Sequence, residues 1–263
     1  MNLNTLNSLN SLAAALCREI ADRADALQVR VETAACGTML IDCGIAVPGS
    51  LEAAILVARV CLADLADVSL DDATTPWPTV NVSTREPVRA CLASQYAGWE
   101  IKAEKYFAMG SGPMRAAAAR EPLFQEIGFQ ESSEFCVGVL ESSKLPTEAV
   151  CRDLATKCGI APEQLTLLVA STSSLCGTLQ IVARSVETAL HKLHELGFDL
   201  TQIVTGTGTA PLPPLAENDF AAIGRTNDAI LYGGRVALEV RSDDLTLQQI
   251  GPQIPSSASA DYG

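Results

Sequence analysis

Arg184 and Glu187 are the residues of this sequence whose types and spacing best support acid–base chemistry. They follow an apolar run, residues 165–170, and a Ser/Thr/Gly turn, residues 171–177. Residues three positions apart on a helix can bring their side chains together, and a carboxylate so placed can accept and return a proton. The same spacing is also common in exposed surface ion pairs that stabilise a protein very little. Spacing alone leaves both interpretations open.

The residues around this pair predict a strand followed by a long helix with one buried face. Apolar residues recur at three- and four-residue steps, as on a helix that packs against a core: Leu179, Val182, Val186, Leu190 and Leu193. A polar line borders this stripe: Gln180, Arg184, Glu187 and His191. We therefore expect the polar line to be half-buried at the rim of a cleft. The pattern does not require a direct role for His191.

A second candidate site is the Gly-rich turn at 108–113. It follows a strand-like run, residues 99–107, and precedes an alanine run at 116–119. Free backbone amides at such a turn can hold an anion or another polar ligand. The turn lacks the G-x-G-x-x-G spacing of dinucleotide-binding folds, and an ordinary tight turn remains the alternative interpretation.

The composition indicates a compact protein with a negative surface. The net charge of −13 argues against a nucleic-acid or acidic-membrane partner, because both require a positive surface. The nine cysteines include no C-x-x-C pair and there are only two histidines, so a zinc or haem site is not expected. Scattered cysteines in apolar runs indicate free thiols in a reducing compartment. With no signal peptide and no apolar stretch of membrane-spanning length, we expect a cytoplasmic protein.

Helical and strand patterns interchange along the chain without a strict βαβ rhythm. The fold class expected is α/β (mixed α+β), built as two lobes with the active-site cleft between them. The predicted helices lie at 4–28, 50–65, 87–98, 146–159 and 216–223. The predicted strands are a hairpin at 28–33 and 38–43, single strands at 78–84, 99–107, 134–142, 164–170 and 199–214, and two strands within 229–241.

Five sequence blocks resemble methenyltetrahydromethanopterin cyclohydrolases. They are IDCGIAVPGSLEA (41–53), YFAMGSGP (106–113), STSSLCGTLQIVARSVETALHKL (171–193), GRTNDAILYGGR (224–235) and PSSASADYG (255–263). The resemblance implies two α/β lobes and a homotrimer. We expect one lobe to comprise 1–95 plus about 205–263, and the other, residues 96–204, to carry the catalytic helix.

The same resemblance implies the reaction and its residues. The expected activity is the reversible hydrolysis of 5,10-methenyltetrahydromethanopterin, or its dephospho form, to the 5-formyl derivative in one-carbon metabolism, either methanogenesis or formaldehyde oxidation. Glu187 matches the family's catalytic glutamate and Arg184 its partner arginine. No metal and no resident cofactor are expected, since the pterin carrier is itself the substrate. Turns at 108–113, 171–177 and 224–228 are expected to form the walls of the pterin site. The expected substrate-binding residues are Tyr106, Gly110, Ser111, Gly112, Ser173, Ser174, Asn227 and Asp228, with Asn227, Asp228 and Asp42 less strongly indicated.

Two departures from the family pattern bear on these expectations. Met114 stands where relatives tend to have alanine, which predicts a narrower pocket there. Relatives also continue beyond Gly263, so we expect the last segment to border a part of one lobe that is absent, and the chain to be less stable for it. A non-catalytic pterin-binding or assembly subunit is the alternative function. A hydrolase with a Ser or Cys nucleophile is weaker, because neither histidine lies in a triad context.

Overall fold

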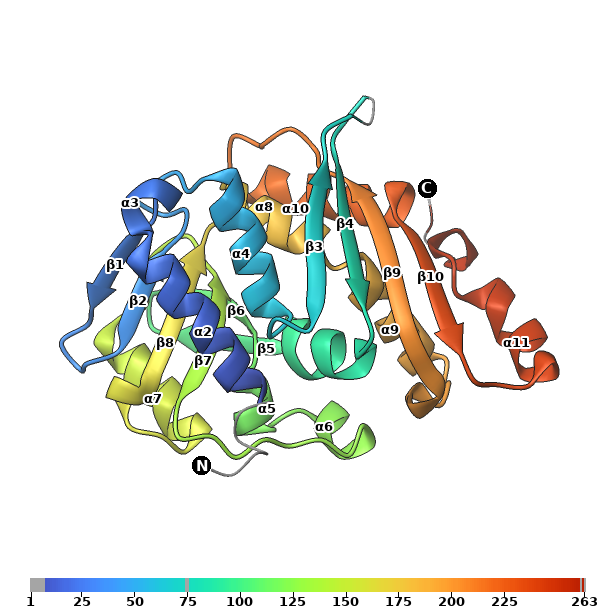
Figure 1. Cartoon of the computed structure of the whole chain (residues 1–263), viewed down its shortest axis with the longest axis horizontal. Helices are drawn as coiled ribbons and strands as arrows, with labels where there is room; N and C mark the ends of the chain where they lie inside the picture. The colour runs from blue at the N-terminus through green and yellow to red at the C-terminus, as the bar shows by residue number, and fades with distance from the viewer. Residues whose placement is uncertain (1–7, 74–75, 261, 263) are drawn as a thin grey trace.

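Two β-sheets lie side by side in the computed structural model, which describes residues 8–73, 76–260 and 262 (Figure 1). The larger sheet has the strand order β1-β2-β8-β7-β6-β5. Its strands are β1 (Arg30–Thr33), β2 (Met39–Asp42), β5 (Trp99–Ala103), β6 (Tyr106–Ser111), β7 (Cys136–Glu141) and β8 (Leu165–Ala170). Strands β2, β8 and β7 are parallel, and the outer strands join them antiparallel.

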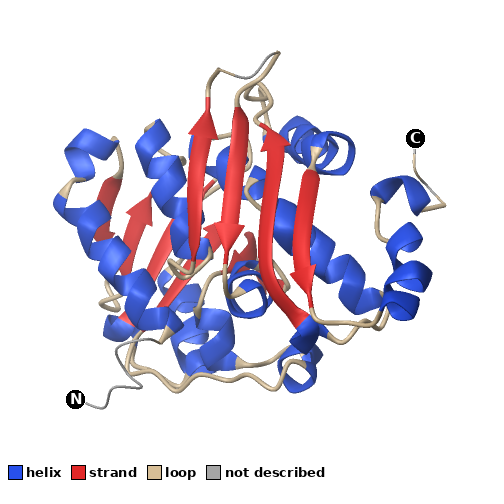
Figure 2. Cartoon of the chain, turned by 45° about the vertical axis from the view of Figure 1, so that its right-hand side comes forward, coloured by secondary structure: helices blue, strands red, loops and turns tan. Residues whose placement is uncertain are grey.

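The smaller sheet is fully antiparallel, with the order β10-β9-β4-β3. Its strands are β3 (Ala66–Asp71), β4 (Thr79–Thr84), β9 (Ile203–Pro211) and β10 (Arg235–Val240). The helices of this part lie behind the sheet, whose other face is toward the viewer (Figure 2). They are α8 (Leu175–Val182), α9 (Ser185–Glu195) and α10 (Asp219–Gly233).

The remaining helices cover the larger sheet and connect the two sheets. In front of the larger sheet lie α2 (Leu9–Asp22) and α4 (Leu51–Cys61), and α7 (Glu148–Cys158) lies behind it (Figure 1). The shorter helices are α3 (Ala24–Leu27), α5 (Met114–Ala118), α6 (Pro122–Glu126) and α11 (Asp244–Ile250). A π-helix, η1 (Val88–Gln95), follows β4, and the 3-10 turns are η2 (Pro162–Gln164), η3 (Leu200–Gln202), η4 (Gly251–Gln253) and η5 (Ser256–Ala258).

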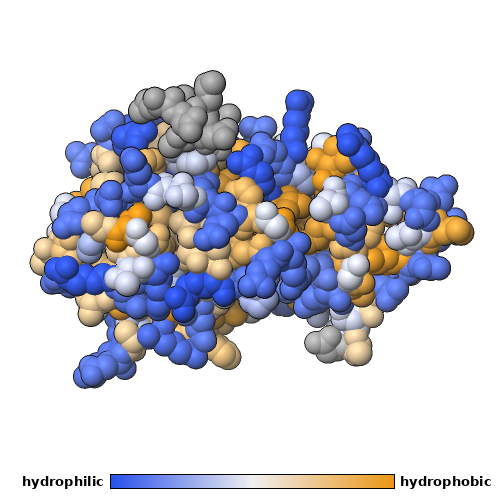
Figure 3. All heavy atoms as spheres, turned by 90° about the horizontal axis from the view of Figure 1, so that it is seen from below, coloured by the Kyte–Doolittle hydropathy of each residue, from blue (hydrophilic) through white to orange (hydrophobic). Residues whose placement is uncertain are grey.

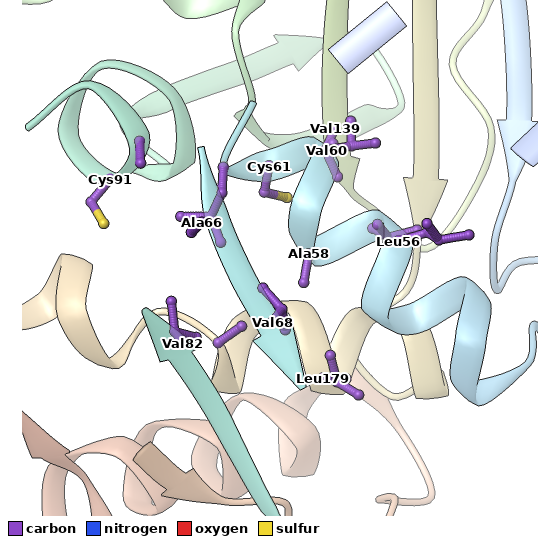
Figure 4. Close-up of a cluster of buried hydrophobic side chains, with 14 of the residues drawn as sticks. Leu56, Ala58, Val60, Cys61, Ala66, Val68, Val82, Cys91, Val139 and Leu179 are labelled. Atoms are coloured by element: carbon purple, nitrogen blue, oxygen red, sulfur yellow. The ribbon is translucent and has the colours of Figure 1, made fainter. Parts of the chain in front are cut away.

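One hydrophobic core runs between the two sheets. Val68 and Val82 of the smaller sheet belong to the same buried cluster as Val139 of the larger one. Helices α4 and α8 contribute to the same cluster, and Figure 4 shows side chains of α4 and Leu179 of α8 together with the valines. Because apolar area removed from water is the main stabilising contribution, this shared core ties the sheets to each other. The division into two lobes at residue 95 remains a prediction, and β1 and β2 lie in the same sheet as β5 to β8.

Two glycines of β9 bring α9 against the smaller sheet. A Cβ on Gly208 would lie 2.4 Å from Ser185 Oγ, and a Cβ on Gly206 would lie 2.9 Å from Val186 Cγ1. A side chain at either position would push the helix away from the strand, so only glycine permits this close approach. The glycines thus set the position of the first turn of α9, which carries Glu187.

The mixed α/β class and most of the expected elements are confirmed, but β3, α6 and α11 were not predicted, and further details differ. The predicted strand at 99–107 is a hairpin, β5 and β6, and the first of two strands predicted within 229–241 is the end of α10. The single long helix is two, α8 and α9, and the helix expected from residue 4 begins at Leu9, with residues 4–7 outside the described residues. None of the helices described is long and apolar enough to cross a membrane.

Candidate active site

Arg184 lies at the break between α8 and α9 and serves as the N-cap residue of α9. Its backbone has φ −90° and ψ 11°, and that of Ala183 has φ −67° and ψ 3°, so the helical path is interrupted at these two residues before α9 begins. The apolar stripe keeps its phase across the break, and all five of its residues are buried as predicted. In the described part of the chain no hydrogen bond or ion pair joins Arg184 to Glu187, so the direct contact that their spacing allows is not formed. The positive charge of Arg184 still acts on the Glu187 carboxyl group.

The Arg184 guanidinium instead binds three groups from neighbouring elements. Nη1 donates to the carbonyl of Gln95 at 2.9 Å, and Nη2 donates to Gln180 Oε1 at 2.9 Å and to Ser111 Oγ at 3.4 Å. Cys61 Sγ lies 3.6 Å from the same Gln180 oxygen. These three acceptors hold the planar, five-donor guanidinium in one orientation. The structure therefore brings two predicted residues, Arg184 and Ser111, into direct contact.

Glu187 is a buried carboxyl group in the first turn of α9. It is 6% exposed, and Arg184 and Gln180 of the same polar line are 7% and 2% exposed. Burial, the largest influence, raises the pKa of Glu187 from 4.5 to about 7, while the positive charges of Arg184 and Arg115 act to lower it. A carboxyl group whose pKa lies near neutrality is suited to both accepting and donating a proton. The predicted polar line is thus more deeply buried than a cleft rim.

Aromatic and cationic side chains of η1, α5 and α9 stack on one another near the start of α9. Tyr96 stacks on His191 with ring centroids 4.9 Å apart, and the Arg115 guanidinium lies 5.0 Å from the centre of the Tyr96 ring. Burial raises the pKa of Tyr96, and the charge of Glu187 raises it further. His191 itself also faces Glu195, at 3.4 Å.

A groove of about 460 Å³ lies along the opposite end of β6. Side chains alternate across a strand, so Phe107 and Met109 share a face with Ser111, and Met109 lies about 7 Å from it along the strand. The groove is lined by residues of β6, of the loops after β7 and β8, and of α10, including Tyr106, Phe107, Met109, Glu141, Thr172, Asp219 and Ile223. Tyr106 is 4% exposed, and its hydroxyl has no hydrogen-bond partner within the described residues.

The predicted Ser171–Gly177 turn uses its hydroxyl groups to hold the chain. Ser174 caps α8 by accepting from the amide of Gly177 at 3.0 Å, and it donates to the carbonyl of Ser171 at 2.7 Å. Ser173 donates its amide and its hydroxyl to Asp219 Oδ1 at 2.9 and 2.7 Å. These bonds fix the turn against the start of α10, at the edge of the groove.

Asp42 has a comparable structural role. Its carboxylate accepts from three backbone amides, those of Gly44, Ile45 and Ala46, at 2.7 to 3.0 Å. The side chain is 1% exposed. A carboxylate with three amide donors is already satisfied, so Asp42 shapes the loop before α4.

Asn227 and Asp228 lie in the middle of α10 rather than in a turn. The expectation of a turn at 224–228 is therefore wrong, because Asn218 caps a helix that runs through these residues to Gly233. Both side chains are exposed. Asn227 follows Asp219 and Ile223 at four-residue steps, so it continues the face of α10 that lines the groove.

Met114 does not narrow a pocket as expected. It is fully buried in a second cluster of apolar side chains, between the larger sheet and α7, where its side chain fills the space over Gly138. The close packing leaves no room for a Cβ on Gly138, which would lie 2.2 Å from Met114 Sδ.

The sequence did not point to Gln95, Tyr96 and Arg115 as neighbours of the acid–base pair. They come from η1 and α5, about 70 to 90 positions before α9 in the chain, where no local pattern signals them. All nine cysteines are free and buried, as the sequence predicted. Within residues 8–73, 76–260 and 262, no group of three His, Cys, Asp or Glu side chains is placed to hold a metal ion.

Comparison with known proteins shows a similarity that covers nearly the whole chain. The family described as "Cyclohydrolase (MCH)" matches residues 8–263. A methenyltetrahydromethanopterin cyclohydrolase of Methylobacillus flagellatus is 45% identical over 260 residues, which cover 97% of this chain and 79% of that protein. The proteins of the same name from Methylobacterium organophilum and Methanosarcina barkeri are 44% and 40% identical, over 97% of this chain and 81% and 82% of their own lengths. These alignments span the elements that carry Ser111, Arg184 and Glu187.

Proposed function

Because the chain belongs to the methenyltetrahydromethanopterin cyclohydrolase family, we propose that it hydrolyses 5,10-methenyltetrahydromethanopterin, or the dephospho form, to the 5-formyl derivative in one-carbon metabolism. The reaction is reversible. The observation that carries this proposal is a buried Glu187 whose pKa of about 7 lies near neutrality, beside a buried arginine. The names of the relatives support the substrate.

The reaction requires a base and then an acid. Water attacks the bridging carbon, a C–O bond forms, and Glu187 takes one proton from the water. Glu187 then gives this proton to N10 as the C–N10 bond breaks, and the second proton of the water leaves to solvent. With a pKa of about 7, Glu187 populates both protonation states at neutral pH, so one group serves both steps.

The charge of the substrate favours the order of these steps. The methenyl bridge is an amidinium cation, and a positive charge near a carboxyl group favours the ionised form. Binding therefore lowers the pKa of Glu187 and makes it a base. Once the ring opens the cation is gone, so the pKa rises again and Glu187 becomes the acid that protonates N10.

Arg184 is proposed to assist the reaction as a hydrogen-bond donor held in a fixed orientation. Its Nε has no hydrogen-bond partner in the described part of the chain, while both of its terminal nitrogens are held in place. In our proposal the guanidinium stabilises the oxygen that develops negative charge after water attacks. The fixed orientation matters because preorganised donors need not rearrange during the reaction.

The carrier is proposed to bind along the face of β6. Ser111, between Gly110 and Gly112, contacts Arg184 and lies near the reacting carbon, and the groove beyond Met109 receives the rest of the molecule. Tyr106 lines this groove, Ser173 with Ser174 belongs to the turn at its edge, and Asn227 with Asp228 follows the α10 residues that line it. The family resemblance further supports a cytoplasmic homotrimer that needs no resident cofactor.

Absorbance of the methenyl carrier tests the function directly. Hydrolysis opens the conjugated bridge, so the chain should remove the chromophore faster than buffer alone and in proportion to protein concentration. Starting from the 5-formyl derivative, the same protein should restore it. If the chain binds the carrier without changing its absorbance, it is a pterin-binding subunit rather than a hydrolase.

A further inference from the structure

Gln95 holds the break between α8 and α9 from both sides. It is the last residue of η1 and is fully buried. Its side-chain Nε2 donates to the carbonyl of Ala183, the residue that ends α8, at 3.0 Å. Its own carbonyl accepts from Arg184 Nη1, the residue that begins α9, at 2.9 Å. One residue thus binds each of the two positions where the helical path is interrupted.

The Ala183 carbonyl needs this partner. The last carbonyls of a helix have no donor from the next turn, and buried ones require another partner. A carbonyl only accepts, so the side-chain amide of Gln95 must present its NH₂ group to Ala183 and its Oε1 elsewhere. That Oε1 is buried, and no hydrogen-bond donor reaches it from the residues described.

The end of η1 is itself firmly placed. Arg115 Nη1 donates to the carbonyls of Leu92 and Ser94 at 2.9 and 3.3 Å, and Arg115 also forms an ion pair with Glu121. The rings of Tyr96 and Phe124 lie 5.0 and 5.2 Å from its guanidinium carbon. The backbone that carries Gln95 is therefore held by a fully buried charged group. π-helical segments of this kind are frequent at functional sites.

We propose that Gln95 is the positioning residue of the acid–base pair: by binding Ala183 and Arg184 it sets the break that places Arg184 beside Glu187. The inference rests on the proposed hydrolytic function. Gln95 acts through Arg184 and does not need to touch the substrate. A shift of about 1 Å in a catalytic group is enough to lower turnover roughly 100-fold, so loss of this clamp should be visible in kcat.

The groups that face Glu187 decide how its titration responds. Arg184 adjoins it at the helix break, and Arg115 of α5 adds a second positive charge. From η1 and its end come Cys91 and Tyr96, whose pKa values the charge of Glu187 raises. His191 lies one turn further along α9. Since Arg184 is the larger of the two lowering influences, moving it away should raise the apparent pKa of the acid–base group.

Three variants test the inference in the full chain. Gln95→Met keeps the length of the side chain and removes the donor to Ala183. Gln95→Glu keeps the shape, and its ionised carboxylate cannot donate. The matched control is Ser94→Ala, which removes another fully buried bond of the same helix, from Ser94 Oγ to the carbonyl of Cys61 at 2.6 Å, without touching the break. Thermal unfolding of all three confirms that they are folded.

The expected result is a kcat lowered roughly 10- to 100-fold in both Gln95 variants, with KM within about threefold of the parent. The apparent pKa in the kcat profile should rise in both, whereas Ser94→Ala should keep the kcat and the pH profile of the parent. A Gln95→Met or Gln95→Glu protein with parental kcat and an unmoved profile overturns the inference but leaves the hydrolytic function intact. A Ser94→Ala protein whose kcat falls as far as that of the Gln95 variants also overturns the inference and leaves the hydrolytic function intact. A parent that does not hydrolyse the carrier rejects both.

Discussion

At the scale of single residues, two opposing influences set the pKa of Glu187. Burial disfavours the carboxylate, and the guanidinium groups of Arg184 and Arg115 favour it. Burial is the larger influence, so the pKa rises to about 7. This balance leaves the group half-ionised at neutral pH, where a general acid–base works best. It also means that the folded protein holds a proton that the unfolded chain would release.

Replacing Glu187 by Gln should therefore stabilise the protein at alkaline pH. Below about pH 4.5 the Glu187 carboxyl group is protonated in both the folded and the unfolded protein, so its ionisation does not change the stability. As pH rises from 4.5 through 7 the unfolded chain ionises first, so the parent loses stability, by on the order of 3 kcal/mol at most once pH exceeds 7. Glutamine cannot ionise, so the Glu187→Gln protein does not lose this stability. Urea unfolding of both proteins from pH 4 to 9 measures the difference in their free energies of unfolding.

The control for this experiment is Glu217→Gln, which changes an exposed carboxylate. It should show no comparable gain between pH 5 and 9. If the stability difference between Glu187→Gln and the parent is flat over that range, the raised pKa of Glu187 is wrong.

Arg184→Lys tests the geometry of the arginine rather than its charge. Lysine keeps one positive charge but cannot bind Gln95, Gln180 and Ser111 at once from a planar fork. We expect kcat to fall roughly 10- to 100-fold. Combined with Glu187→Gln, the loss should be smaller than the product of the two single losses, since the residues act as a unit. Steady-state kinetics of the two single variants and the double variant measures these changes in kcat. If the loss of kcat in the double variant equals the product of the two single losses, the residues act independently.

At the scale of the elements, the helix break is what the sequence could not reveal. The five apolar residues of the stripe keep a helical period through Ala183 and Arg184, both good helix formers. The interruption there accompanies hydrogen bonds to Gln95, which is 88 positions away from Ala183. Local patterns contain no information about such a partner. They did predict that the polar line borders the apolar stripe, because amphipathic spacing is a local property, but they did not predict how deeply Gln180, Arg184 and Glu187 are buried.

Two other elements show where turn signals mislead. Residues 224–228 contain glycine, asparagine and aspartate, which favour turns, yet the capped helix α10 passes through them. The β5–β6 hairpin turns at Glu104 and Lys105, which give no glycine or asparagine signal for a tight turn. Strand pairing and helix packing outweighed local preference in both cases. The hairpin of β1 and β2 has its glycine and was predicted correctly.

A pair of glycine substitutions tests these elements. In Gly177→Ala the new Cβ would lie 1.8 Å from the carbonyl oxygen of Ser171, so the turn before α8 must move, and we expect a loss of roughly 1–3 kcal/mol. In Gly224→Ala nothing lies within 4 Å and the residue is inside a helix, so a gain of about 0.5–1 kcal/mol is expected. Denaturant midpoints measure both changes. A destabilised Gly224→Ala protein would argue for a turn at this position after all.

At the scale of the whole molecule, two sheets share one core and the acid–base pair lies within it. Residues of β9 support α9 from one sheet, while Ser111 of β6 contacts Arg184 from the other. The site therefore depends on the relative placement of both sheets. Hydrophilic residues are spread over the face seen from below, with hydrophobic ones between them (Figure 3). A net charge of −13 favours the approach of a cationic substrate.

The chain should be active without a metal ion. The substrate is already an electrophilic cation, so the proposed chemistry needs a proton carrier rather than a Lewis acid. Treatment with a chelator followed by gel filtration should leave the hydrolysis rate within about twofold of that of the untreated protein. Loss of a catalytic group would instead lower the rate roughly 100-fold. Activity that disappears and returns on adding zinc would show that a metal takes part.

The most direct test of the account compares Glu187→Gln with the parent in the absorbance assay. Gln fills the same space but cannot cycle a proton, so kcat should fall by roughly 10²–10⁴-fold. Carrier binding, measured separately by fluorescence or calorimetry, should change far less. Glu217→Gln serves as the surface control and should keep the parental rate. A Glu187→Gln protein that binds the carrier and turns it over like the parent would contradict the account, because the proton carrier would then be another group.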